Sequence, residues 1–106
     1  MPIYLDSYYT LNVTIQDADA AAEDISAWTL EIQFWQGSSK IVTLETDSGI
    51  EFTTDGTDGQ FDITLTTAQA DLFSVGTTRV LIFRTDSNRT LQFEGTEVVE
   101  GPQYDS

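Results

Sequence analysis

Carboxylates make up almost all of the reactive side chains in this chain. Of its 106 residues, 18 are Asp or Glu, and the sequence contains neither histidine nor cysteine. Without cysteine it has no thiol nucleophile. Without histidine it lacks the usual general base, the usual metal ligand and the usual pH switch near neutrality. Paired carboxylates could perform glycoside hydrolysis, which needs one of the pair protonated in an apolar setting. No pair lies in such a sequence context, so we assign no catalytic residue and no cofactor, and expect a protein that is not an enzyme.

Two acidic segments carry the oxygen ligands that calcium prefers. Their members are Asp55, Asp58 and Asp62 in one, and Asp17, Asp19 and Glu23 in the other. The spacing from Asp55 to Gly59 does not follow the ligand order of an EF-hand loop. A solvated hairpin turn explains the first segment more simply, and we predict no metal site.

Trp35 is the clearest candidate for an interaction site. It follows Phe34, and successive residues of a strand point to opposite faces, so a buried Phe34 would place Trp35 outside. Leu81 and Phe83 can extend the same outer patch. Three interpretations stay open: packing on a neighbouring strand or under a loop, an anchor in a protein interface, or a platform for a sugar. The other aromatic candidates for a sugar platform are Tyr4, Tyr8 and Tyr104.

Short stretches of alternating polarity predict the strands that position these residues. From residue 28 to 34, Trp28, Leu30, Ile32 and Phe34 alternate with polar residues, which is typical of a strand with one buried face. Trp28 is thus expected in the core. Further strands are predicted over residues 9–15, 40–45, 50–53, 61–65, 78–85 and 90–99. In the last of these, Leu91 and Phe93 share one face. Short strands separated by turns about every ten residues favour an antiparallel sandwich or barrel.

One short helix interrupts the strands. Thr66 and Gln69 have the spacing of a capping box, which predicts a helix over residues 68–73 with Gly76 just beyond it. Leu72 and Phe73 are expected to cover the open end of the core. The strongest turn signal is the segment 55–59, where two glycines can adopt a positive φ.

The net charge of −14 argues against anionic partners. The basic residues are Lys40, Arg79, Arg84 and Arg89. Such a surface repels phosphate backbones and anionic lipids, so we expect neither nucleic acid nor membrane as a partner. Solubility, a basic partner surface and a high-salt habitat all remain as explanations of the acidity. The first residues lack the basic start and apolar segment of a signal peptide, which predicts folding in a cytoplasm.

Three segments together resemble a known group of proteins. They are Asp24–Thr29, Leu65–Gln69 and Arg89–Gly95. In order and spacing they resemble the small immunoglobulin-like β-sandwich modules of tailed-phage virions, such as the N-terminal domains of baseplate upper proteins and related fibre-attachment modules. The resemblance covers about residues 7–100. It implies an all-β, immunoglobulin-like antiparallel sandwich of seven or eight strands with one short helix, in a single domain spanning residues 1–106.

The resemblance also implies a function. It suggests a non-enzymatic structural protein of the virion, assembled in the host cytoplasm, that forms a homo-oligomer and contacts other virion proteins. A tail, baseplate or fibre-attachment role comes first, with Trp35, Leu81 and Phe83 as interface residues. Members of that group often lead into a longer fibre region, whereas this chain stops at Ser106, which suggests an adaptor, plug or decoration. The alternatives are a capsid decoration protein and a carbohydrate-binding module.

Overall fold

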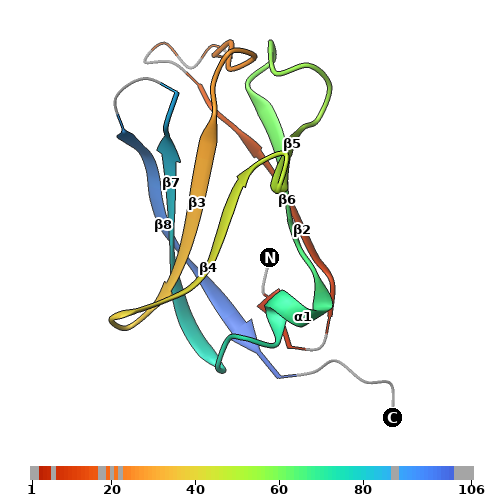
Figure 1. Ribbon diagram of the computed structural model, residues 1–106, viewed down its shortest axis with the longest axis vertical. Coiled ribbons are helices and arrows are strands. Elements are labelled where there is room, and N and C mark those ends of the chain that lie inside the picture. The colour runs from red at the N-terminus through yellow and green to blue at the C-terminus, as the bar shows by residue number, and fades with distance from the viewer. Residues whose placement is uncertain are drawn as a thin grey trace.

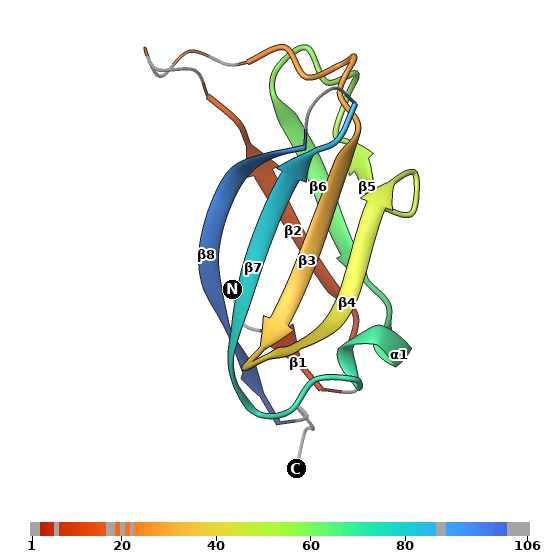
Figure 2. The same cartoon turned by 60° about the vertical axis from the view of Figure 1, so that its left-hand side comes forward.

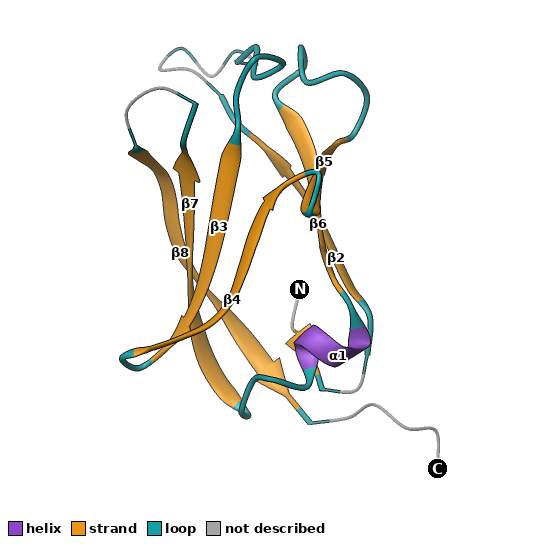
Figure 3. Cartoon of the chain, viewed as in Figure 1, coloured by secondary structure: helices purple, strands orange, loops and turns teal. Residues whose placement is uncertain are grey.

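The computed structural model describes residues 3–5, 7–16, 19, 21, 23–86 and 89–101. These residues form an all-β chain with one short helix, α1, at Thr67–Ala70 (Figure 1 and Figure 3). The strands are β1 Ile3–Tyr4, β2 Tyr9–Thr14, β3 Leu30–Gln36, β4 Ser39–Thr46, β5 Gly49–Phe52, β6 Gln60–Leu65, β7 Gly76–Arg84 and β8 Thr90–Glu100. The seven strands expected from the alternation are all present, and the two-residue strand β1 is an addition.

The eight described strands join in one sheet, in the order β1-β8-β7-β3-β4-β5-β6-β2. The sheet folds back on itself and is almost barrel-like (Figure 2). Its contacts are antiparallel except for two parallel contacts, each two residues long, between β1 and β8 and between β4 and β5. Among the described residues no ladder joins β2 to β8, so the sheet does not close there.

The concave side of this sheet holds a continuous hydrophobic core. Leu30, Ile32 and Phe34 of β3 all point into it and are at most 2% exposed. Inward residues of the other strands surround them, because every second side chain of a strand faces the same way. These are Ile3, Tyr9, Val42, Leu44, Ile50, Phe61, Ile63, Leu65, Val80, Ile82 and Val99.

The helix α1 covers one end of this core. Its capping box is present: the Thr66 hydroxyl accepts from the Gln69 amide, and the Gln69 side chain accepts from the Thr66 amide. Phe73 is buried and meets the ring of Phe34 edge to face, with 5.7 Å between centroids. Leu72, however, is 60% exposed, so the expectation that it covers the core is wrong. The helix has ended at Ala70, and the turn that follows directs only Phe73 inward.

The position of Trp28 also differs from the expectation. Strand β3 begins at Leu30, and Trp28 lies in the turn before it, where its amide donates to the Ile25 carbonyl. Trp28 is only half-buried, and the Arg84 guanidinium lies 4.3 Å from its ring centroid. Trp28 therefore borders the core under a cation–π contact and is not enclosed by it.

Strand β8 contains an irregularity that the alternation missed. Ile82 lies opposite Phe93, but Phe83 lies opposite Leu91, so Gln92 is an extra residue. An extra residue in one strand of a pair reverses the phase of its side chains. Leu91 therefore shares the outer face with Phe83, while Phe93 shares the inner face with Ile82. The prediction that Leu91 and Phe93 lie on one face is wrong for this reason.

Candidate interaction surface

The residues predicted to form an interface lie on the outer face of two neighbouring strands. Trp35 of β3 pairs with Arg79 of β7, and the preceding outward residue of β3, Gln33, pairs with Leu81. Phe83 follows Leu81 two residues later on the same face. Trp35, Leu81 and Phe83 are each half-buried. The structure thus brings the three predicted residues onto one surface, which we call the outer β3–β7 face.

A chain of hydrogen bonds crosses this face and orients Trp35. The indole Nε1 of Trp35 donates to Gln33 Oε1 at 2.9 Å, and Gln33 Nε2 donates to Glu31 Oε2 at 2.6 Å. Arg89 donates to the same Glu31 oxygen at 2.6 Å. Residues two apart on a strand share a face, which is why Glu31, Gln33 and Trp35 can meet in this way. The indole is therefore held in a fixed orientation before any partner arrives.

Arg89 adds both charge and cover to the face. Its guanidinium lies 4.1 Å from the centroid of the Phe83 ring. The hydrogen bond from Arg89 lowers the pKa of the Glu31 carboxyl, although partial burial acts in the opposite direction. Glu31 therefore stays ionised well into acidic solution. The Arg89 guanidinium also covers one face of the Phe83 ring.

Leu91 belongs to the same surface but was not identified from the sequence. It lies opposite Phe83 on β8 and is 46% exposed. Only the bulge at Gln92 brings it to this side, and nothing in the local alternation signals that bulge. The outer β3–β7 face therefore reaches β8, where Leu91 adds an exposed apolar residue. Arg79 of β7 and Glu94 of β8 lie on the same face, with 4.0 Å between Arg79 Nε and Glu94 Oε1.

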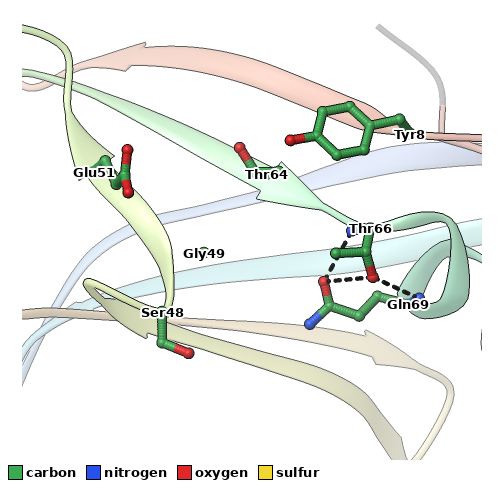
Figure 4. Close-up of a pocket in the computed structure, with 7 residues that line it drawn as sticks. All are labelled: Tyr8, Ser48, Gly49, Glu51, Thr64, Thr66 and Gln69. Carbon is green, nitrogen blue, oxygen red and sulfur yellow. Dashed lines mark hydrogen bonds between the residues drawn. The ribbon is translucent and has the colours of Figure 1, made fainter.

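A separate hollow of about 360 Å³ lies beside β5, β6 and the entry to α1 (Figure 4). Its walls come from the β4–β5 turn, from β5 and β6, and from the start of α1. The residues that line it are Tyr8, Ser48, Gly49, Glu51, Thr64, Thr66 and Gln69. Figure 4 shows the Tyr8 ring across the hollow from Ser48. An exposed ring beside hydroxyls, an amide and a carboxylate is a surface of the kind that can contact a sugar.

The structure places one of the aromatic residues proposed for a sugar platform at this hollow. Tyr8, just before β2, is 65% exposed and lines this hollow. Tyr4 lies half-buried in β1, away from the lining residues. Tyr104 is outside the described residues. Of the three candidates, only Tyr8 is placed by the structure at a polar hollow.

In the first acidic segment considered for calcium, Asp55 and Asp58 use their carboxylates to shape a turn. Asp55 accepts from both the amide and the hydroxyl of Thr57, at 3.0 and 2.6 Å. Asp58 accepts from the amide of Gln60. These bonds hold a turn in which Gly59 has a φ of +73°, and a side chain there would collide with the carbonyl oxygens of Ile15 and Glu23. Asp17 is outside the described residues, and the described part of the chain contains no cluster of three or more potential metal ligands.

Among the described residues, the carboxyls with clearly shifted pKa values all shift downward. A hydrogen bond from Ser26 lowers the pKa of Asp24, and one from Thr57 lowers the pKa of Asp55. Hydrogen bonds from Arg89 and Arg84 lower the pKa of Glu31 and of Asp86, respectively. A general acid for glycoside hydrolysis needs the opposite shift. These four groups are therefore suited to structural hydrogen bonding and not to donating a proton at neutral pH.

Two further findings bear on identity. Within the described residues, no helix is both long and apolar enough to cross a bilayer. No protein-family model matches the chain, and no curated protein is significantly similar to it in sequence.

Proposed function

We propose that this chain is a non-enzymatic structural protein of a phage virion, acting through protein–protein contacts in a tail, baseplate or fibre attachment. The outer β3–β7 face carries the proposal. It presents a fixed tryptophan with half-buried Leu81 and Phe83, and polar side chains frame it. Interfaces often combine an aromatic anchor with a polar rim in this way. The acidic remainder of the surface would guide the chain toward a basic site on its partner.

The proposed fold is an immunoglobulin-like sandwich. In this description, β1, β8, β7, β3 and β4 form one layer, and β5, β6 and β2 form the other. Two observations support it. The β4–β5 contact is only two residue pairs long, so the layers are weakly joined, and no ladder of described residues joins β2 to β8. The segments that carry the resemblance to phage modules lie directly before β3, at the entry to α1 and at the start of β8.

The copy number of the chain in purified virions tests this role. Quantitative mass spectrometry should find a few to about a few dozen copies per particle, in a ratio that fits three- or six-fold symmetry. Hundreds of copies, scaling with the shell protein, would support the alternative of a capsid decoration protein. Absence from the particle would rule out both virion roles.

A substitution of Trp35 tests which surface makes the contact. Trp35→Ala should leave the fold intact, because the side chain is on the outer face, and should weaken oligomerisation or incorporation into particles about 30-fold, as for an interface anchor worth about 2 kcal/mol. Leu72→Ala removes an exposed apolar side chain away from this face and is the matched control. Equal incorporation of both variants and the unsubstituted chain would show that the interface lies elsewhere.

The hollow beside Tyr8 favours a carbohydrate-binding module as the second candidate. This function predicts that the isolated chain binds a glycan through Tyr8 and its polar neighbours. A glycan array probed with the purified protein separates the two. Binding by the isolated chain, with no copies in the virion, would replace the structural role by this one, and a blank array would remove it.

A further inference from the structure

The opening between β2 and β8 is an apolar groove bordered by two strand edges. β2 pairs with β6 on one side, and β8 pairs with β7 on one side. In the described chain no strand pairs with the other side of β2, and only β1 pairs with the other side of β8, at Val99 and Glu100. In Figure 2, β8 forms the left-hand border of the sheet. Such strand edges can pair with an added strand.

The groove reaches down to core residues. It has a volume of about 250 Å³, and most of its lining is apolar. Its apolar walls are formed by Tyr9, Leu11, Val13, Phe93, Val80 and Ile82. Phe34 and Ile63, both nearly inaccessible, lie at its floor. This volume is below the range typical of small-molecule sites, about 300–1,000 Å³, and suits a few side chains of a strand.

Phe93 is the most exposed part of the wall. It points inward from β8, yet 52% of it is exposed. Its ring lies against the α-carbon of Gly95, where any side chain would collide with it. An aromatic ring packed over a glycine on a border strand stabilises the strand at that position. It leaves the outer surface of the ring available to a further apolar group.

The lower end of the same edge already receives an added strand. β1 pairs in parallel with the last two residues of β8, and its Ile3 is completely buried. The hydroxyl of Tyr9 donates to Glu97 Oε2 at 3.1 Å and crosses the opening just above this point. β1 therefore fills the part of the opening below this hydrogen bond, and the groove beside Phe93 is the part that remains.

The charges beside the groove determine the kind of strand that fits. β8 carries Glu94, Glu97 and Glu100 and no basic residue, and β2 has no charged residue. A second copy of β8 would set glutamates against glutamates, and like charges on paired strands are destabilising. Glu94 faces outward opposite Leu81 and Glu97 lines the groove, so a strand that carries Lys or Arg would lie beside carboxylates instead.

From this geometry we propose that the β2–β8 groove binds an extended segment of a partner protein, in which apolar residues alternate with Lys or Arg. The apolar residues enter the groove against Phe93 and Leu11, and the segment's backbone pairs with the free edge of β8. This is recognition by strand addition. The proposal concerns a different surface from the outer β3–β7 face and holds whether or not the chain belongs to a virion.

Synthetic peptides test the proposal directly. The probes are four ten-residue peptides in which Lys alternates with Val, Ile, Leu or Phe. Matched peptides carry Glu in place of Lys, or contain two prolines that prevent strand pairing. At least one Lys peptide should bind with a dissociation constant below about 1 mM. The dissociation constants of its Glu and proline counterparts should be at least about tenfold higher. Amide hydrogen exchange along β8 should slow when the peptide binds.

Two variants with the same charge change locate the binding site. Phe93→Lys places a cation in the groove and should weaken peptide binding about tenfold or more. Leu91→Lys changes a similarly exposed residue of the same strand on the opposite face and should leave binding within about twofold. Thermal melting of both variants checks that the fold is retained.

Three outcomes would overturn the proposal. The first is that no Lys peptide binds the unsubstituted chain. The second is that Phe93→Lys and Leu91→Lys weaken binding equally, which would indicate general electrostatic attraction. The third is concentration-dependent dimerisation that Phe93→Lys abolishes, measured by analytical ultracentrifugation, which would assign the groove to a second copy of the chain.

Discussion

Phe34 is almost completely buried, whereas Trp28 is only half-buried. Phe34 is 2% exposed, and the Phe73 ring meets it edge to face. Trp28 is half-buried beneath the Arg84 guanidinium, which also forms two hydrogen bonds with Asp86. Removing a buried ring costs the transfer free energy and leaves a cavity, whereas removing a bordering ring lets water take its place.

The two rings should therefore differ in their contribution to stability. Phe34→Ala should lower the free energy of unfolding by about 3–5 kcal/mol. Trp28→Ala should lower it by about 1–2 kcal/mol, from partial burial and one cation–π contact. Urea denaturation of both variants measures the difference. Equal losses would mean that Trp28 is as deeply buried as Phe34.

Individual strands could be predicted from the sequence because their side chains alternate strictly. β3 shows this best, since Leu30, Ile32 and Phe34 all lie in the core as the alternation requires. The prediction failed where an added residue shifts the phase, as at Gln92 of β8. Leu91 was missed for the same reason. β1 was also missed, because two residues are too short to show a period and are held by pairing with a distant strand.

Arg89 and Glu31 connect strands that are not neighbours. Arg89 directly precedes β8, Glu31 lies on β3, and β7 runs between β3 and β8. The hydrogen bond from Arg89 lowers the pKa of Glu31 below its ordinary value of 4.5. A lowered carboxyl pKa in the folded state adds stability that is present above the unfolded pKa and is lost as the pH falls through the folded pKa.

Glu31→Gln should therefore reduce stability at neutral pH, and its effect should disappear in acid. The difference in free energy of unfolding between the unsubstituted chain and Glu31→Gln should be largest above about pH 5 and should shrink as the pH falls below 4.5. Urea titrations at several pH values measure it. Glu45→Gln is the control. It removes the carboxylate that lies opposite Glu31 on β4 and leaves the hydrogen bond between Arg89 and Glu31 in place. A difference that does not change with pH would show that Arg89 does not stabilise the ionised carboxylate.

The charges of the whole molecule are unevenly distributed over its strands. Lys40, Arg79 and Arg84 lie on β4 and β7, and Arg89 directly precedes β8. β5 and β6 carry acidic residues without any basic one, and β2 carries no charged residue. Glu51 lies directly opposite Asp62 across β5 and β6. The Asn12 side-chain amide donates to Asp62, but this amide carries no charge, so the repulsion between the two carboxylates remains.

A net charge of −14 should make the folded state sensitive to salt, because self-repulsion opposes compactness. The urea midpoint should rise as NaCl increases from about 0.01 to 0.5 M, over which the screening length falls from about 30 Å to a few ångströms. Glu51→Gln removes one of two facing carboxylates and should stabilise the fold by about 0.5 kcal/mol at low salt. This gain should shrink at high salt. A midpoint that falls with salt would show instead that ion pairs such as Arg89 with Glu31 outweigh the repulsion among the remaining carboxylates.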